Sequence, residues 1–197
     1  MQHIDVSVFQ KAKKGNYYCG DSYFYEESDD YFVCALADGL GSGEFAKESS
    51  QLVIDTIKAS PDASVKTLMR QCNQQLTGKR GVVLGILQLD LHTMQYAYSS
   101  IGNIGLVTVT ANAVKKRNIP QAGYLSGFDR PFKVITGDIE EGMIFLLFSD
   151  GVTSREIAKK YFLHREVYQI TDAFASFHQN ALADDTTLIA MKYDTTS

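Results

Sequence analysis

Four acidic positions of the sequence stand where apolar segments begin or end. Asp38 follows the apolar run at residues 31–37, and Asp150 follows the run at residues 143–148. A carboxylate at the rim of a sheet loses part of its hydration, and a bound divalent cation compensates that loss. Grouped carboxylates are hard oxygen ligands, which suit Mg²⁺ or Mn²⁺ better than zinc. The acidic positions are, in chain order, Asp21, Asp38, Asp150 and the pair Asp184-Asp185.

Each of these aspartates also has a purely structural interpretation. Asp-Gly is a common turn dipeptide, and Asp is a common residue before a helix. For one position alone the structural interpretation is the better one, but the joint occurrence at strand ends favours a metal site. The four histidines show no ligand spacing. Cys19, Cys34 and Cys72 are odd in number and widely spaced, which predicts reduced thiols rather than disulfides or a zinc site.

The elements that must position these aspartates follow from hydrophobic periodicity. The alternation at residues 4–9 and the compact run at residues 31–37 predict strands. The glycine-rich segment at residues 39–43 leads into a helix at residues 44–59, which would place Phe45, Leu52, Val53 and Ile57 on its buried face. A second helix is expected to begin at Ser60 or Asp62, to bury Val65, Leu68, Met69, Cys72 and Leu76, and to end near Gly78.

The second half of the chain changes period twice. Short β-branched or aromatic runs predict an antiparallel meander, then a helical pattern extends from residue 153 to about residue 183. Helices grouped after strands, rather than alternating with them, predict an α+β fold with helices packed on sheet faces. The strands expected here are residues 82–89, 94–100, 104–110, 132–135, 143–149 and 187–193.

Composition limits the possible partners and compartments. The 197 residues, of which 45% are hydrophobic, predict a single domain over residues 1–197. A net charge of −4 with dispersed Lys and Arg argues against a nucleic-acid partner. The longest apolar run, residues 143–148, is too short to cross a membrane, and residues 1–5 begin no signal peptide. We therefore expect a cytoplasmic protein.

Four motifs of the sequence resemble the ordered motifs of the PP2C (PPM) family of metal-dependent serine/threonine phosphatases. The resemblance spans residues 19–190 and implies a four-layer αββα sandwich, with two mainly antiparallel sheets flanked by helix pairs. It also implies two Mn²⁺ or Mg²⁺ ions that activate water to hydrolyse phosphoserine or phosphothreonine. The motifs are Gly20-Asp21, Ala37-Asp38-Gly39-Leu40-Gly41-Ser42-Gly43, Phe148-Ser149-Asp150-Gly151 and Asp184-Asp185-Thr186-Thr187.

Within that family, the small size and the Asp-Gly-Leu-Gly-Ser-Gly form are most similar to the Bacillus-type stress-response phosphatases. That similarity implies a phosphorylated STAS-domain regulatory protein as substrate and partner. We expect the enzyme to be a monomer.

The resemblance also implies roles for individual residues. Asp38 would bridge the two metals, and the Gly39 carbonyl would be a further ligand of one of them. Asp150 and Asp184 would complete the other site. Asp21 matches the outer acidic position, which holds an ion through a metal-bound water.

Further matched positions depart from the family pattern. Asp185 stands where many relatives carry Asn, and Asn103 stands where many carry Asp, so both are expected to support the metal ligands rather than to bind metal directly. Lys14 lies in the stretch where larger members carry a phosphate-binding arginine. With Gly41, Ser42 and Gly43, it forms the predicted substrate-facing set.

Two alternatives remain open from the sequence. Residues 41–46 fit G-x-G-x-x-A after a strand and before a helix, which is also the pattern of a dinucleotide-binding turn. A regulatory module with this fold but without turnover is the other alternative, and it would tolerate the loss of Asp38. The loop at residues 123–128, with two glycines and aromatic residues, could face a substrate.

Overall fold

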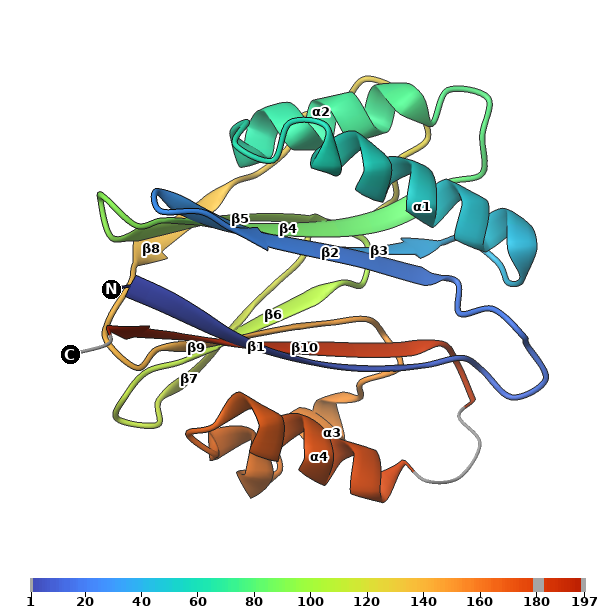
Figure 1. Ribbon diagram of the computed structural model, residues 1–197. Coiled ribbons are helices and arrows are strands. Elements are labelled where there is room, and N and C mark those ends of the chain that lie inside the picture. Colours follow the sequence, from blue (N-terminus) through green and yellow to red (C-terminus); the bar gives the residue numbers. More distant parts are fainter. Residues whose placement is uncertain (1, 179–182, 196–197) are drawn as a thin grey trace.

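The protein folds into two five-stranded sheets stacked face to face, with helices on both outer faces (Figure 1). The structure, a computed structural model, describes residues 2–178 and 183–195. Every pair of neighbouring strands in both sheets is antiparallel. This architecture confirms the predicted α+β four-layer sandwich, and the antiparallel pairing leaves no place for the parallel β-α-β unit of the dinucleotide alternative.

The first sheet has the strand order β1-β10-β9-β6-β7, and the second has the order β2-β3-β4-β5-β8. The antiparallel register of β2 and β3 pairs Asp21 with Asp38, so both lie at one end of the second sheet. The strands of the first sheet are β1 (Gln2–Lys11), β10 (Thr186–Thr195), β9 (Ile144–Phe148), β6 (Gly105–Val109) and β7 (Lys115–Asn118). Those of the second are β2 (Asp21–Glu27), β3 (Tyr31–Gly39), β4 (Val82–Asp90), β5 (Gln95–Ile101) and β8 (Ile135–Asp138).

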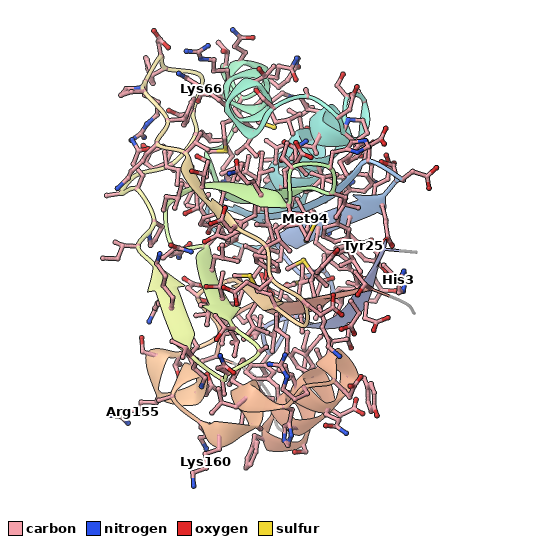
Figure 2. All side chains as sticks on the ribbon, turned by 90° about the vertical axis from the view of Figure 1, so that its left-hand side faces the viewer. His3, Tyr25, Lys66, Met94, Arg155 and Lys160 are labelled. Carbon is pink, nitrogen blue, oxygen red and sulfur yellow. The ribbon has the colours of Figure 1, made fainter. Side chains whose placement is uncertain are left out.

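Helices cover both sheets. The second sheet is covered by α1 (Glu44–Lys58) and α2 (Val65–Gln75), and the first by α3 (Ser154–Ile157), the 3₁₀ turn η1 (Lys160–Leu163) and α4 (Val167–Phe177). In Figure 2, Lys66 of α2 projects from one end of the stack, and Arg155 and Lys160 project from the other. None of the described helices is long and apolar enough to cross a membrane.

Strand β4 shows why the central strands are apolar throughout rather than alternating. Its residues Val83, Leu87 and Leu89 pack in the core between the two sheets. Its residues Val82, Leu84 and Ile86 pack in the core beneath α1 and α2. A strand with a sheet on one face and helices on the other must bury both sets of side chains. The chain's apolar runs therefore mark the middle layers of the sandwich.

The two N-terminal helices pack largely as the sequence predicts, but α2 begins at Val65, after the Ser64 cap, and not at Ser60 or Asp62. The Ser64 hydroxyl accepts a hydrogen bond from the Thr67 backbone N–H at 3.3 Å and caps α2. The predicted apolar stripe of α2 is fully or almost fully buried. The prediction for Phe45 was wrong, because this side chain is 68% exposed. In that turn of α1 the residue that packs on β3 is Ala46, whose backbone lies against Gly39.

Three parts of the second half differ from expectation. β7 is a polar edge strand without apolar alternation, so it is missing from the predicted strands. β8 begins at Ile135 rather than at residue 132. The helical pattern from residue 153 is divided into α3, η1 and α4, because Lys159 and Glu166 adopt extended backbone angles. Residues 179–182 of that prediction lie outside the described residues.

Candidate active site

The acidic site is built at the strand ends that lie on the right in Figure 1. Asp21 opens β2 and Asp38 lies one residue before the end of β3, and the antiparallel register places the two directly opposite each other. Asp150 lies in the turn two residues after the end of β9, and Asp184 lies two residues before β10. Because β9 and β10 are also neighbours, all four aspartates belong to one end of the sandwich.

Asp21 is the most deeply held of these side chains, with no exposed surface. The hydroxyls of Ser149 and Thr187 both donate hydrogen bonds to its Oδ2, at 2.8 Å and 2.6 Å. Its Oδ1 is buried and has no hydrogen-bond partner among the described residues. Two donors thus fix the carboxylate in one orientation and leave one buried oxygen to be satisfied by another group.

Burial, and after it the neighbouring like charges, raise the pKa of three of these carboxyl groups. Burial, followed by the charges of Asp21, Asp150, Asp184 and Asp185, raises the pKa of Asp38 to about 8. Burial raises the pKa of Asp21 to about 6, against the opposing effect of its two hydroxyl donors. Burial and then Asp184 also raise the pKa of Asp150. An additional positive charge at this place would stabilise all of these carboxylates.

Asn103 and Asp185 support the cluster from two sides. The Asn103 amide donates a hydrogen bond of 2.6 Å to Asp150 Oδ2. The buried Asp185 accepts one from the Lys13 backbone N–H and one from the Gly20 backbone N–H, each at 2.8 Å. Asp185 therefore anchors the loop between β1 and β2 and does not project as a free ligand. Asp184, by contrast, is exposed.

The glycines after two of the aspartates are required by close packing. A Cβ on Gly39 would lie 1.9 Å from the Ala46 backbone oxygen, and one on Gly151 would lie 2.0 Å from the Thr186 hydroxyl oxygen. Both contacts are far below any real carbon–oxygen separation. The Asp-Gly pairs thus let α1 and the start of β10 approach the carboxylates, which a simple turn would not require.

The predicted substrate-facing residues lie on the loops around this cluster. Gly41 and Ser42 are exposed, and Gly43 is the residue before α1. Gly41 has a φ of 98°, a left-handed conformation that favours glycine. Lys14 is exposed on the loop that Asp185 anchors. Contact of these residues with a substrate stays a prediction.

The cluster fits hard divalent cations in its chemistry. Its donors are carboxylate oxygens, one of them buried without a partner among the described residues, and burial and neighbouring like charges raise the pKa of Asp38 and Asp21. Within residues 2–178 and 183–195, no group of three or more His, Cys, Asp or Glu side chains is arranged as a metal site. An open set matches Mg²⁺, which keeps several waters and takes only one or two carboxylates from the protein.

Comparison with known proteins assigns the family. The model of the Stage II sporulation protein E (SpoIIE) family matches residues 28–194. The chain belongs to this family. The SpoIIE-type chain is 32% identical, over 188 residues, to "Phosphoserine phosphatase RsbX" of Bacillus subtilis strain 168, covering 95% of this chain and 94% of that protein. The crystal structure of RsbX in complex with magnesium superposes with a TM-score of 0.89 at 32% identity, covering 98% of this chain and 96% of the other.

Two more distant structures share the fold of this SpoIIE-family chain. One comes from work on the bacterial stressosome and has a TM-score of 0.84 at 20% identity, covering 96% and 99% of the two chains. The other contains the PP2C phosphatase domain of SpoIIE from Bacillus subtilis, with a TM-score of 0.81 at 16% identity, covering 100% of this chain and 64% of the other. The PP2C-type fold expected from the motifs is thereby confirmed.

Sequence reasoning missed the hydroxyls that hold Asp21. Ser149 and Thr187 both stand inside the quoted motifs, next to or near an aspartate, and were given no role. A polar residue inside an otherwise apolar strand end was the available signal, since Ser149 and Thr187 are both fully buried. The reciprocal bond from the Thr187 backbone N–H to the Ser149 hydroxyl, at 2.9 Å, joins the two motifs.

Proposed function

We propose that this protein is a metal-dependent phosphatase that hydrolyses phosphoserine or phosphothreonine on a STAS-domain regulator of bacterial stress signalling. We propose further that it acts in the cytoplasm as a monomer. The observation that carries the activity is the in-register pair Asp21 and Asp38, joined by Asp150 and Asp184 at one end of the sandwich. A sequence identity of 32% to RsbX over nearly the whole chain supports the phosphoserine substrate.

In this proposal, two Mg²⁺ or Mn²⁺ ions bind at the cluster, and when bound they neutralise phosphate charge and make a water reactive at neutral pH. Asp38 and the Gly39 carbonyl, with Asp150 and Asp184, are the proposed ligands. Asp21 is the proposed acceptor for a water of one ion, because its Oδ1 is buried and unpartnered among the described residues.

The chain's own side chains fix the orientation of these oxygens before substrate arrives. Ser149 and Thr187 hold Asp21 Oδ2, Asn103 holds Asp150 Oδ2, and Asp185 ties the β1–β2 loop in place. Ligands held by a second layer of hydrogen bonds lose less freedom on binding an ion. No side chain needs to form a covalent intermediate in this proposal.

The deciding experiment is phosphate release from a phosphoserine peptide by the purified protein, with and without Mn²⁺ and with a chelator. We expect release only with added metal. Full activity of metal-stripped protein would refute the two-metal proposal. Absence of release under all conditions, with metal binding intact, would instead favour the regulatory module without turnover.

A further inference from the structure

A groove of about 630 Å³ begins at Leu40, two residues after Asp38. It lies between Leu40-Gly41, the turn at residues 77–81 after α2, and the loop residues Tyr124 and 126–128. Leu40 is two residues from Asp38, and its backbone N–H donates a 2.9 Å hydrogen bond to the Gly81 carbonyl. The groove therefore continues the surface on which the phosphate would be held.

The charge of the groove is opposite to that of the cluster. Its described lining contains Lys79 and Arg80 and no carboxylate. Arg80 donates a 3.3 Å hydrogen bond to the Leu40 carbonyl, and its guanidinium lies 5.8 Å from the centre of the Phe45 ring. Lys79 is 3.4 Å from Glu48, so Arg80 is the stronger candidate for an incoming carboxylate. A guanidinium has five N–H donors, and the bond to Leu40 uses one.

Aromatic side chains form the apolar part of the groove. Phe128 is 80% exposed and Tyr124 is 48% exposed, although both belong to a well-anchored loop. Exposed aromatic rings on a fixed backbone are the residues that most often anchor protein partners. The sequence indicated this loop as a possible substrate contact, and the acidic site itself makes no use of it.

The loop at residues 122–128 is anchored by the buried Asn73 of α2 and by Arg130. The Asn73 side chain accepts hydrogen bonds from the Ser126 and Gly127 backbone N–H groups and donates one to the Phe128 carbonyl. Arg130 donates to the Ala122 and Tyr124 carbonyls. A groove that is already formed binds without first ordering its own backbone, which favours affinity for an extended segment.

We propose that the groove binds the extended segment of the substrate protein next to its phosphoserine. The bound segment carries an acidic side chain for Arg80 and an apolar side chain for the surface of Tyr124 and Phe128. This inference rests on the proposed phosphatase activity and adds the chemistry of the substrate sequence to it. The cations of the groove are complementary to an acidic side chain of the bound segment. The groove also begins at Leu40, on the loop that follows Asp38, so a segment next to the phosphoserine would reach it.

The test uses three phosphoserine peptides of equal length. One carries Glu and Leu beside the phosphoserine, the second carries Lys and Leu, and the third carries Glu and Ser. We expect the wild-type protein to prefer the first peptide over each of the others by about tenfold in kcat/KM. Arg80→Glu should reverse the preference between Glu and Lys, and Phe128→Ala should remove the preference for Leu.

Hydrolysis of p-nitrophenyl phosphate shows that each variant is folded and active, and the preference is measured as the ratio of kcat/KM between two peptides within one variant. Arg70→Glu is the matched control, since Arg70 is exposed on α2 and does not line the groove.

An active wild type whose preferences survive Arg80→Glu and Phe128→Ala would overturn the groove alone. A wild type inert toward all peptides and the small ester would overturn the proposed function. If sedimentation shows a dimer that Phe128→Ala dissociates, the groove binds a second copy of the chain, and the inference is overturned.

Discussion

The acidic cluster and the adjacent groove meet at Leu40 and are constructed in opposite ways. The cluster places carboxylates at strand ends, from the buried Asp21 to the exposed Asp150 and Asp184, where neighbouring strands hold them within a like-charged group. The groove places cations and aromatic rings on loops, where they are exposed. Gathering the acids destabilises the fold unless a cation compensates their charge, whereas the groove side chains remain solvated and add little strain.

In the proposed function, the acidic cluster carries the reaction and the groove recognises the protein segment around the phosphate. A phosphate group is itself anionic, so an acidic cluster attracts it only when cations are bound there. The protein segment around the phosphate meets a surface of the opposite sign and of greater apolar content. Substitutions in the cluster should therefore affect every substrate alike, and substitutions in the groove should affect only substrates large enough to reach it.

The largest expected effect is loss of turnover when a proposed metal ligand is replaced. Asp38→Asn or Asp150→Asn should lower kcat by about three orders of magnitude, equivalent to about 4 kcal/mol of transition-state stabilisation, for peptides and small esters alike. The fold should persist, because each change removes like-charge repulsion. The comparison is with Asp172→Asn, which makes the same chemical change on the exposed face of α4. Near wild-type rates in either variant with saturating metal would make the ligand assignment wrong.

A second effect follows from the groove. The value of kcat/KM should be highest for a phosphorylated STAS protein, lower for a short phosphopeptide from it, and lowest for free phosphoserine, by about a hundredfold overall. Binding energy from the flanking segment is absent with the free amino acid. Steady-state kinetics with the three substrates measures this order. Equal values would contradict recognition outside the cluster, and hydrolysis of free phosphoserine alone would indicate small-molecule metabolism.

Sequence patterns were sufficient for the layers and for the acidic positions, and the physical reason is the same for both. Strands buried on two faces must be apolar throughout, so an aspartate at the end of such a run is conspicuous. β7 carried no such signal, since its Lys-Lys-Arg-Asn sequence is that of a solvated edge. For Phe45, helical spacing gave the face of α1 but not how far the sheet beneath it extends.

The groove could not be predicted because three segments distant in sequence form it. Arg80 has no distinguishing neighbour in the chain, and its position over Gly41 depends on the turn after α2. Gly41 itself was noted as part of a glycine-rich motif. The structure adds a second reason for that glycine, because a Cβ there would lie 2.5 Å from the Arg80 guanidinium.

A smaller effect is expected from the hydroxyls behind the cluster. Ser149→Ala removes one of two donors to Asp21 and leaves the Thr187 backbone N–H without its partner. Loss of such a supporting bond weakens metal binding or activity by about tenfold or more, so the Mn²⁺ concentration for half-maximal activity should rise by about that factor. Metal titration of the activity measures the shift. Ser176→Ala, on the exposed part of α4, is the control, and an equal shift there would remove the role given to Ser149.

The smallest expected effect is on the stability of metal-free protein as the pH changes. The pKa of Asp38 is raised to about 8 and that of Asp21 to about 6, both above the value of 3.8 for an ordinary aspartate. Between pH 4 and pH 8 the folded state thus binds more protons than the unfolded state, so the free energy of unfolding decreases as the pH rises. Thermal unfolding in chelator should show Tm lower at pH 8 than at pH 5, by about 3 °C for each kcal/mol lost.

Asp38→Asn should flatten this dependence and raise Tm at pH 8 in chelator, because the amide carries no charge to bury. Saturating Mn²⁺ should reverse the sign for the wild type, since metal binding needs deprotonated carboxylates and strengthens with rising pH. The Asp172→Asn variant should keep the wild-type slope, because Asp172 is exposed and lies outside the cluster. A metal-free Tm that rises from pH 5 to pH 8 would show that the carboxylates are compensated within the protein. The acidic cluster would then cost the metal-free fold no stability, and in this respect it would not differ from the groove.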